Sequence, residues 1–224
     1  IAAAMEQLTA TNGQVHEAVT QVHDLSNEVA GSMRSSEQST QTLSQATESV
    51  QELVSRFKIG RGAFDYNVDQ ARQFRDAIQD CLARLAAGGV NIWDQNYRPI
   101  PGTNPQKYDV SYCSAFEQKV QPLLEAALGS LKGGVYTLII DTRGYGAIHN
   151  QKYSRPLTGN YENDLVGNRT RRIWDDMTGQ RGAKNMLPML VQTYARDTGE
   201  ILSEINMPIM VDGRHWGSIR VGCE

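Results

Sequence analysis

The stretch MPIMVDGRHWGSIRVG, residues 207–222, has the pattern of two β-strands joined by a tight turn. Asp212 and Gly213 supply the turn, because an Asp-Gly pair tolerates the positive φ angles that a two-residue hairpin turn requires. Apolar Ile219 and Val221 mark one face of the second strand as the core side. Alternation then predicts that this face also carries His215 and Gly217, and that the opposite face carries Arg214, Trp216, Ser218 and Arg220.

Three more strands are expected before this hairpin. Residues 134–141 (GVYTLIID) and 145–150 (YGAIHN) form a pair across a turn at Gly144, and the segment that begins LPMLVQTYA at residue 187 supplies the next strand. A polar insertion of helix and loop, residues 150–186, separates the second strand from the third. This order predicts a five-stranded antiparallel sheet.

Two helical segments precede the sheet. Apolar residues recur at helical spacing from Ala63 to Leu85, and the glycines of AAGG end this helix. The second segment, residues 114–134 (SAFEQKVQPLLEAALGSLKGG), contains Pro122, which is expected to kink it. Helices flanking an antiparallel sheet place this part of the chain in the α+β class.

The first 59 residues have a different pattern. Small or apolar residues recur with an alternating 4-3 spacing that does not slip, as expected for the seam of a long coiled-coil helix. Two glycines in KIGRGAF, residues 58–64, end the pattern. The sequence therefore predicts a coiled-coil helix at 1–59 and a second domain at 63–224. The seam positions are Ile1, Met5, Leu8, Asn12, Val15, Val19, Val22, Ser26, Val29, Met33, Ser36, Thr40, Leu43, Thr47, Val50, Val54 and Phe57.

Composition and motifs argue against several classes of function. The net charge of −3 provides no basic stripe, so we expect no nucleic-acid partner. Cys81, Cys113 and Cys223 are widely spaced and lack a C-x-x-C pair, which predicts reduced thiols rather than a metal site or a disulfide framework. No nucleophile elbow, metal-spaced His/Glu set or phosphate loop predicts an enzyme, and no cofactor is identified.

Polar residues that converge near the insertion are the candidate ligand-binding residues. His149 and Asn150 lie where the second predicted strand opens into the insertion, and Tyr194 lies within a strand. Arg169 and Arg172 share a face if the segment NRTRRIWDD is helical, and two guanidinium groups would suit a carboxylate or a phosphate. The sixth candidate is His215, at the open end of the last strand.

Four of the candidates also have a purely structural explanation. His215 could bond a neighbouring carbonyl near the turn, and Tyr194 could fill core. The arginines could form a salt-bridge lattice with nearby carboxylates, which are Asp164, Asp175 and Asp176.

Two segments resemble known families. In AAAMEQLTAT, Glu6 and Gln7 stand between small residues, which resembles the methylated helices of bacterial methyl-accepting chemotaxis receptors; an ordinary solvated helix face is the alternative. Residues 1–59 as a whole are similar to the returning helix of the receptor signalling hairpin. Residues 63–223, with HNQKYSRPLTG, NRTRRIWDD and GRHWGSIRVG, resemble the PAS-like fold of Cache sensor domains.

The resemblance implies a function in bacterial chemotaxis. It implies a homodimer through the coiled coil, a small-molecule ligand in the second domain, and methylation at Glu6 and Gln7 by a methyltransferase and methylesterase pair. The histidine kinase and coupling protein would act through a hairpin tip outside this sequence, and the domain would lie in the cytoplasm of a protein that could be membrane-anchored. The alternative is a structural or dimerisation module that caps a coiled coil without binding a ligand.

Overall fold

The computed structural model describes residues 2–56, 62–195 and 199–223. The chain divides into two compact units, residues 1–50 and 51–224, and each is described by itself. The predicted boundary near residues 59–62 falls mostly on residues 57–61, which lie outside the described residues.

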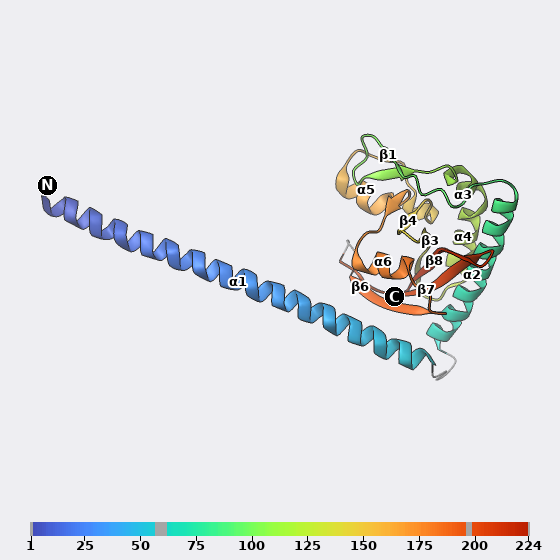
Figure 1. Cartoon of the computed structure of the whole chain (residues 1–224), viewed down its shortest axis with the longest axis horizontal. Coiled ribbons are helices and arrows are strands. Elements are labelled where there is room, and N and C mark those ends of the chain that lie inside the picture. Colours follow the sequence, from blue (N-terminus) through green and yellow to red (C-terminus); the bar gives the residue numbers. More distant parts are fainter. Residues whose placement is uncertain (1, 57–61, 196–198, 224) are drawn as a thin grey trace. The chain divides into compact units, whose positions relative to one another are not determined.

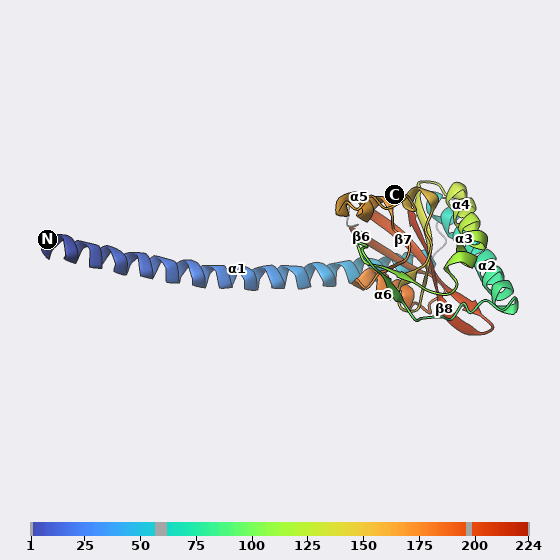
Figure 2. The same ribbon diagram turned by 90° about the horizontal axis from the view of Figure 1, so that it is seen from above.

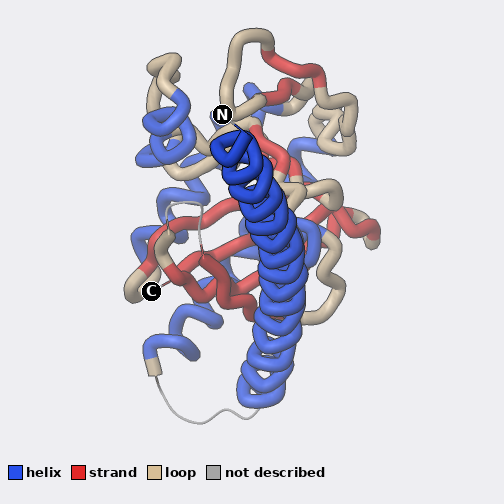
Figure 3. The backbone as a smooth tube through the Cα atoms, turned by 90° about the vertical axis from the view of Figure 1, so that its left-hand side faces the viewer, coloured by secondary structure: helices blue, strands red, loops and turns tan. Residues whose placement is uncertain are grey.

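The first unit belongs to one uninterrupted helix, α1 (Ala2–Arg56), drawn as a single blue coil in Figure 3. The apolar seam side chains that the structure describes are all exposed: Met5, Leu8, Val15, Val19, Val22, Val29, Met33 and Leu43. Ile1 and Phe57, the predicted ends of the seam, lie outside the described residues. The exposure of these apolar side chains leaves most of the predicted seam unburied among the described residues of this chain.

The second unit begins with helices that form one layer. These are α2 (Ala63–Ala87), α3 (Cys113–Lys119) and α4 (Gln121–Ser130). The segment predicted as one kinked helix is split in two, because Pro122 lies in the first turn of α4, where its missing N–H costs nothing. In the described ranges, no helix has both the length and the apolar character needed to cross a lipid bilayer.

A four-stranded antiparallel sheet is the centre of this unit. Its strands are β3 (Gly134–Asp141), β6 (Leu190–Ala195), β7 (Ile201–Val211) and β8 (Arg214–Cys223), in the order β3-β8-β7-β6. Helices α2 and α4 lie on one side of the sheet and α6 (Met177–Ala183) on the other, as Figures 1 and 2 show.

The fifth predicted strand does not join this sheet in the described part of the chain. Residues 145–150 form only β4 (Tyr145–Gly146), which pairs with β5 (Arg172–Ile173) of the insertion. The Asn150 side chain instead occupies the outer edge of β3, where its Oδ1 accepts a hydrogen bond from the Thr137 N–H at 2.8 Å. A side chain therefore satisfies the edge group that a fifth strand would have paired.

The hairpin turn matches its sequence signal. Asp212 and Gly213 have φ angles of 51° and 75°, the positive values of the predicted tight turn. A β-bulge follows, because Met210 pairs with His215 whereas Ile209 pairs with Gly217.

The bulge corrects the predicted alternation. Trp216 is the extra residue, and it packs in the same apolar core cluster as Ile219 and Val221 instead of on the opposite face. Its Nε1 donates to the Ile92 carbonyl at 2.8 Å. Gly217 lets β8 lie close to β3 at this point, since a Cβ on Gly217 would overlap the Ile140 carbonyl. Simple period-two alternation cannot anticipate an inserted residue.

The insertion is made of short helices and strands that contact the neighbouring elements. It comprises η1 (Gln151–Tyr153), α5 (Tyr161–Gly167), β5 and α6, and it adjoins a small hairpin of β1 (Arg98–Ile100) and β2 (Lys107–Asp109). Helix α5 ends at Gly167, so Arg169 and Arg172 do not share a helical face as predicted. Arg169 lies in the following loop and Arg172 begins β5.

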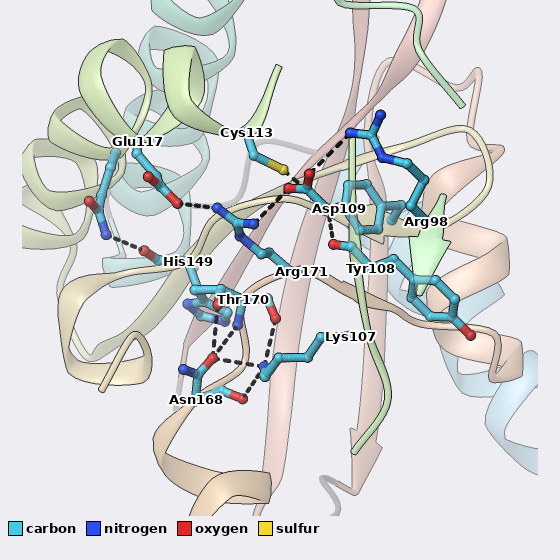
Figure 4. A network of polar contacts seen from close by, with 12 residues as sticks. Arg98, Lys107, Tyr108, Asp109, Cys113, Glu117, His149, Asn168, Thr170 and Arg171 are labelled. Carbon is cyan, nitrogen blue, oxygen red and sulfur yellow. Dashed lines mark hydrogen bonds and ion pairs between the residues drawn. The ribbon is translucent and has the colours of Figure 1, made fainter. Parts of the chain in front are cut away.

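Two polar anchors hold the insertion to the rest of the unit (Figure 4). Arg171, at a φ of 56°, donates to Asp109 Oδ1 at 2.6 Å and to Glu117 Oε1 at 2.9 Å. The buried Lys107 Nζ donates to Asn168 Oδ1, the Asn168 carbonyl and the Thr170 carbonyl, at 2.8 to 3.0 Å. These contacts fix the loop from which β5 starts.

Candidate functional site

The face of the sheet beneath α6 carries many buried polar side chains, beside an apolar cluster that includes Leu138, Ile140 and Leu202. We call it the polar sheet face; its members come from all four strands and are Tyr136, Gln192, Tyr194, Glu204, Asn206, Ser218 and Arg220. Tyr194 is half-buried and the other members are at most 4% exposed. The opposite face is apolar, with Ile139, Ile205, Met207 and Ile219 in the main core. Such a concentration of polar groups in a sheet interior requires an explanation.

Glu204 is the centre of the polar sheet face. Its Oε2 forms an ion pair with Arg220, at 2.6 Å from Nη2 and 2.8 Å from Nε, and also accepts the Tyr136 hydroxyl hydrogen bond. Its Oε1 accepts from Asn206 Nδ2 at 2.8 Å. The Tyr136 hydroxyl lies 2.6 Å from the Tyr194 hydroxyl. A buried carboxylate needs this many donors to compensate for lost hydration.

Electrostatics favour the charged form of Arg220. Burial opposes the charged guanidinium, but the Glu204 carboxylate outweighs it and raises the pKa of Arg220. Burial, followed by the Glu204 charge, raises the pKa of Tyr136 well above its usual value. Tyr136 is therefore a neutral hydroxyl that donates to Glu204 at physiological pH.

Four atoms of the polar sheet face have no hydrogen-bond partner among the described residues. Two are donors, Arg220 Nη1 and Ser218 Oγ, and two are acceptors, Asn206 Oδ1 and Gln192 Oε1. Asn206 and Arg220 are direct cross-strand neighbours, and Ser218 lies two residues before Arg220 on the same face. This set of donors and acceptors can hold a small molecule that itself offers both acceptors and donors.

Trp174 covers part of this face from the insertion. Its ring lies 6.0 Å from the Arg220 guanidinium and 5.8 Å from that of Arg172. Glycines make room for it, since a Cβ on Gly146 would lie 2.5 Å from the ring and one on Gly179 2.6 Å from the Trp174 Cβ. The segment after β5 can therefore approach the sheet closely.

Helix α6 covers the acceptor side of the face. A Cβ on Gly182 would lie 2.5 Å from Asn206 Oδ1, and the Thr178 carbonyl accepts from Gln192 Nε2 at 3.2 Å. Helix α6 therefore packs directly against the same polar groups that a ligand would contact.

Three of the predicted ligand-binding residues lie at this face or beside it. Tyr194 belongs to it, and Arg172 contacts Trp174. The buried His149 ring lies 5.8 Å from Tyr136 and 6.4 Å from Trp174, between centroids. Its Nδ1 accepts from the Asn150 N–H at 2.8 Å, which leaves Nε2 to carry the proton of the neutral ring.

The other three predicted residues have different surroundings. The Asn150 amide is used within the fold, by Thr137 and Glu125. Arg169 is buried, and its N–H donates to the Tyr153 carbonyl at 2.7 Å. His215 is half-buried beside the turn between β7 and β8, where burial lowers its pKa. Among the described residues, Asp164 forms no ion pair of the salt-bridge lattice that was the alternative for the arginines; its carboxylate accepts from the Thr158 and Gly159 N–H groups.

The predicted methylation pair is only partly described. Both residues lie within α1, and Gln7 is exposed, but the Glu6 side chain lies outside the described residues.

The sequence-based prediction does not identify the centre of this candidate site. It singles out neither Glu204 nor Asn206, and it places Ser218 and Arg220 only on the face opposite the core. A usable signal was present, because polar residues at i and i+2 within otherwise apolar strands indicate a second buried layer when that face is covered.

Comparison with known proteins gives little further information. No family model matches the chain, and no curated protein matches it significantly. Among solved structures, it is similar to an extracellular ligand binding receptor from Desulfohalobium retbaense DSM5692, with 13% identity and a TM-score of 0.35. That match covers 71% of this chain and 24% of the receptor chain, so it spans about a quarter of that protein. A likeness this distant carries no argument about function.

Proposed function

We propose that this chain is a sensory module of a bacterial chemotaxis receptor. In this proposal the second unit is a PAS-like or Cache-like sensor that binds a small molecule at the polar sheet face, and α1 is the receptor helix that responds. The observation that carries the ligand-binding part is the set of four buried, unpartnered polar atoms on one sheet face. Leaving such groups without partners costs about 1 to 3 kcal/mol each, so an occupant that pairs with them would bind favourably.

The exposed seam of α1 supports the signalling part. Seam residues such as Val19 and Val22 are more than 60% exposed in the single chain, and pairing with a second copy would bury them. Gly13 and Gly31 weaken the helix by about 1 kcal/mol each relative to alanine, which favours a bundle whose packing a small coupling energy can shift.

Ser218 provides a sharp test of the ligand site. Its buried Oγ has no partner among the described residues, so Ser218→Ala removes a hydroxyl that contributes nothing to the unliganded fold. We expect the variant to be as stable as the wild type or slightly more stable, and to lose roughly three- to tenfold in ligand affinity. Native mass spectrometry would identify a co-purified molecule, and its readdition in thermal-shift titrations would give the affinity.

Thr137→Val is the matched control. Thr137 is equally buried, but its Oγ1 donates to the Leu124 carbonyl at 2.7 Å on the other face of the sheet. This variant should lose about 1 kcal/mol of stability and keep its ligand affinity. A Ser218→Ala protein that is less stable but binds every retained or screened ligand normally would contradict the proposed site.

The remaining parts of the proposal concern partners. They are a homodimer through α1, adaptation by a methyltransferase and methylesterase at Glu6 and Gln7, and control of a histidine kinase and its coupling protein by a tip outside this sequence. A cytoplasmic location belongs to the same proposal, and no catalytic activity is proposed. The competing function is a dimerisation module without a ligand. It predicts a dimer whose melting temperature no metabolite raises.

A further inference from the structure

A separate cavity of about 510 Å³ lies between η1 and α5. Its lining includes Lys152, Tyr153, Arg155, Glu162, Asn163 and Val166, none of which belongs to the polar sheet face. We call it the outer pocket. Its volume lies within the usual range for small-molecule sites, roughly 300 to 1,000 Å³.

Basic side chains outnumber acidic ones in the lining of the outer pocket, and within the described ranges they form no ion pairs. In the part of the chain that the structure describes, neither Lys152 nor Arg155 forms an ion pair, and the Lys152 Nζ lies 5.1 Å from the Tyr153 ring centroid. Glu162 is the one carboxylate of the lining, and it forms no ion pair with any other described residue. The neighbouring Asp164 is turned to Thr158 and Gly159 instead. The lining therefore carries a net positive charge.

The walls of the outer pocket are held in place. The Arg155 N–H donates to the Gly167 carbonyl at 3.1 Å, and the Arg155 carbonyl accepts from Asn168 Nδ2 at 2.6 Å. The Tyr153 ring packs against His149 at 4.8 Å between centroids. These hydrogen bonds fix the backbone of Arg155, so only its side chain must be ordered on binding. This lowers the entropic cost of binding.

We infer that the outer pocket binds a small organic anion, a carboxylate or phosphate whose flat or apolar part lies against Tyr153 and Val166. The guanidinium of Arg155 can make paired charge-assisted hydrogen bonds to either oxyanion, and Lys152 adds a second positive charge. The site is independent of the proposed ligand in the polar sheet face.

Isothermal titration calorimetry of the whole chain with three phenyl compounds tests the inference. Benzoate, phenyl phosphate and benzamide share a ring but differ in charge. We expect benzoate or phenyl phosphate to bind at millimolar concentrations, about tenfold more tightly than neutral benzamide, and more weakly as salt rises. The preferred anion distinguishes a carboxylate site from a phosphate site.

Variants then locate the binding. Arg155→Gln and Lys152→Gln should each weaken anion binding roughly three- to tenfold, whereas Glu162→Gln should strengthen it about twofold or more, because it removes the repelling carboxylate. Arg143→Gln changes an exposed arginine outside the pocket and is the control that should have no effect. Opposite effects of two charge removals cannot come from loss of folding.

Several results would overturn the inference. Binding of benzamide as tightly as the anions, no detectable binding of either anion at millimolar concentrations, or anion binding unchanged by both cation variants would each do so. Ser218→Ala should leave benzoate and phenyl phosphate binding unchanged, which separates this site from the polar sheet face.

Discussion

At the scale of single residues, the stability of the second unit depends on buried charged groups. Glu204 is fully buried and Arg220 is 3% exposed, and the two are paired beneath α6. Such a pair is costly to form and more costly to break, because removing one partner leaves the other charge buried without compensation.

Glu204→Gln should therefore lower the free energy of unfolding by about 3 to 5 kcal/mol. The double variant Glu204→Met/Arg220→Met should recover part of that loss, since no charge then remains buried. Urea denaturation of the wild type, both single variants and the double variant gives the coupling energy between the two sites. Strictly additive losses would contradict the paired arrangement.

Lys107 gives a pH-dependent prediction. Burial, aided by the Arg172 charge, lowers its pKa to about 8, whereas in the unfolded chain it is roughly 10.4. Between these values the unfolded chain binds more protons than the folded chain, so this lysine makes stability rise with pH over that window. Below about pH 8 Lys107 is protonated in both states, and the unfavourable free energy of burying its charge is fully present.

Lys107→Met removes this titration while keeping a long side chain. The difference in unfolding free energy between wild type and variant should shift in favour of the wild type from pH 8 to pH 10. Chemical denaturation at several pH values measures it, and tyrosine ionisation cancels because both proteins share the same tyrosines. A difference that stays constant over this range would contradict the lowered pKa.

At the scale of elements, small residues decide how closely the insertion can approach the sheet. Gly182 of α6 has no room for a side chain above Asn206, and Gly146 and Gly179 leave space for Trp174. By contrast, Gly129 in α4 has nothing within 4 Å of where a Cβ would be. The two kinds of helix glycine should respond to substitution in opposite directions.

Gly182→Ala should lower stability by about 1 to 3 kcal/mol, because α6 must shift away from the polar sheet face. Gly129→Ala is the matched control, and it should be neutral or stabilising by up to about 1 kcal/mol through better helix propensity. Thermal unfolding of both variants distinguishes them. Equal effects would mean that α6 does not pack against Asn206 as described.

At the scale of the whole molecule, the two units have different sources of stability. All the buried hydrophobic residues that the structure describes lie between Val68 and Cys223, whereas the seam of α1 is exposed. The second unit forms its core from its own residues, whereas the proposed function assigns the exposed seam of α1 to packing against other helices.

A fragment of residues 62–224 should consequently fold by itself, with a cooperative thermal transition close to that of the whole chain. Circular dichroism followed with temperature measures the thermal transition, and the near-ultraviolet spectrum reports on the packed core. A fragment with helical signal but without a cooperative transition would show that the core needs residues before position 62.

Association of α1 gives the second prediction at this scale. The whole chain should be a dimer or larger at micromolar concentration, and Val19→Glu/Val22→Glu should make it monomeric, because the seam then carries charge. Thr20→Glu/Gln21→Glu adds the same charge off the seam and should leave association intact. Sedimentation equilibrium tests all three, and a wild type that stays monomeric at high concentration refutes the seam.

The sequence by itself determined whatever depends on local periodicity: the long helix of α1, the helix α2, the turn at Asp212-Gly213 and the core face of β8 at Ile219 and Val221. Tertiary structure decided the rest. The bulge at Trp216 shifted one side chain to the other face, and the Asn150 side chain took the place of a fifth strand at the edge of β3. Glu204, Arg220 and Asn206 meet only because strands distant in sequence pair in one register. Periodicity records which way a side chain points, whereas a site depends on which other strands lie beside it.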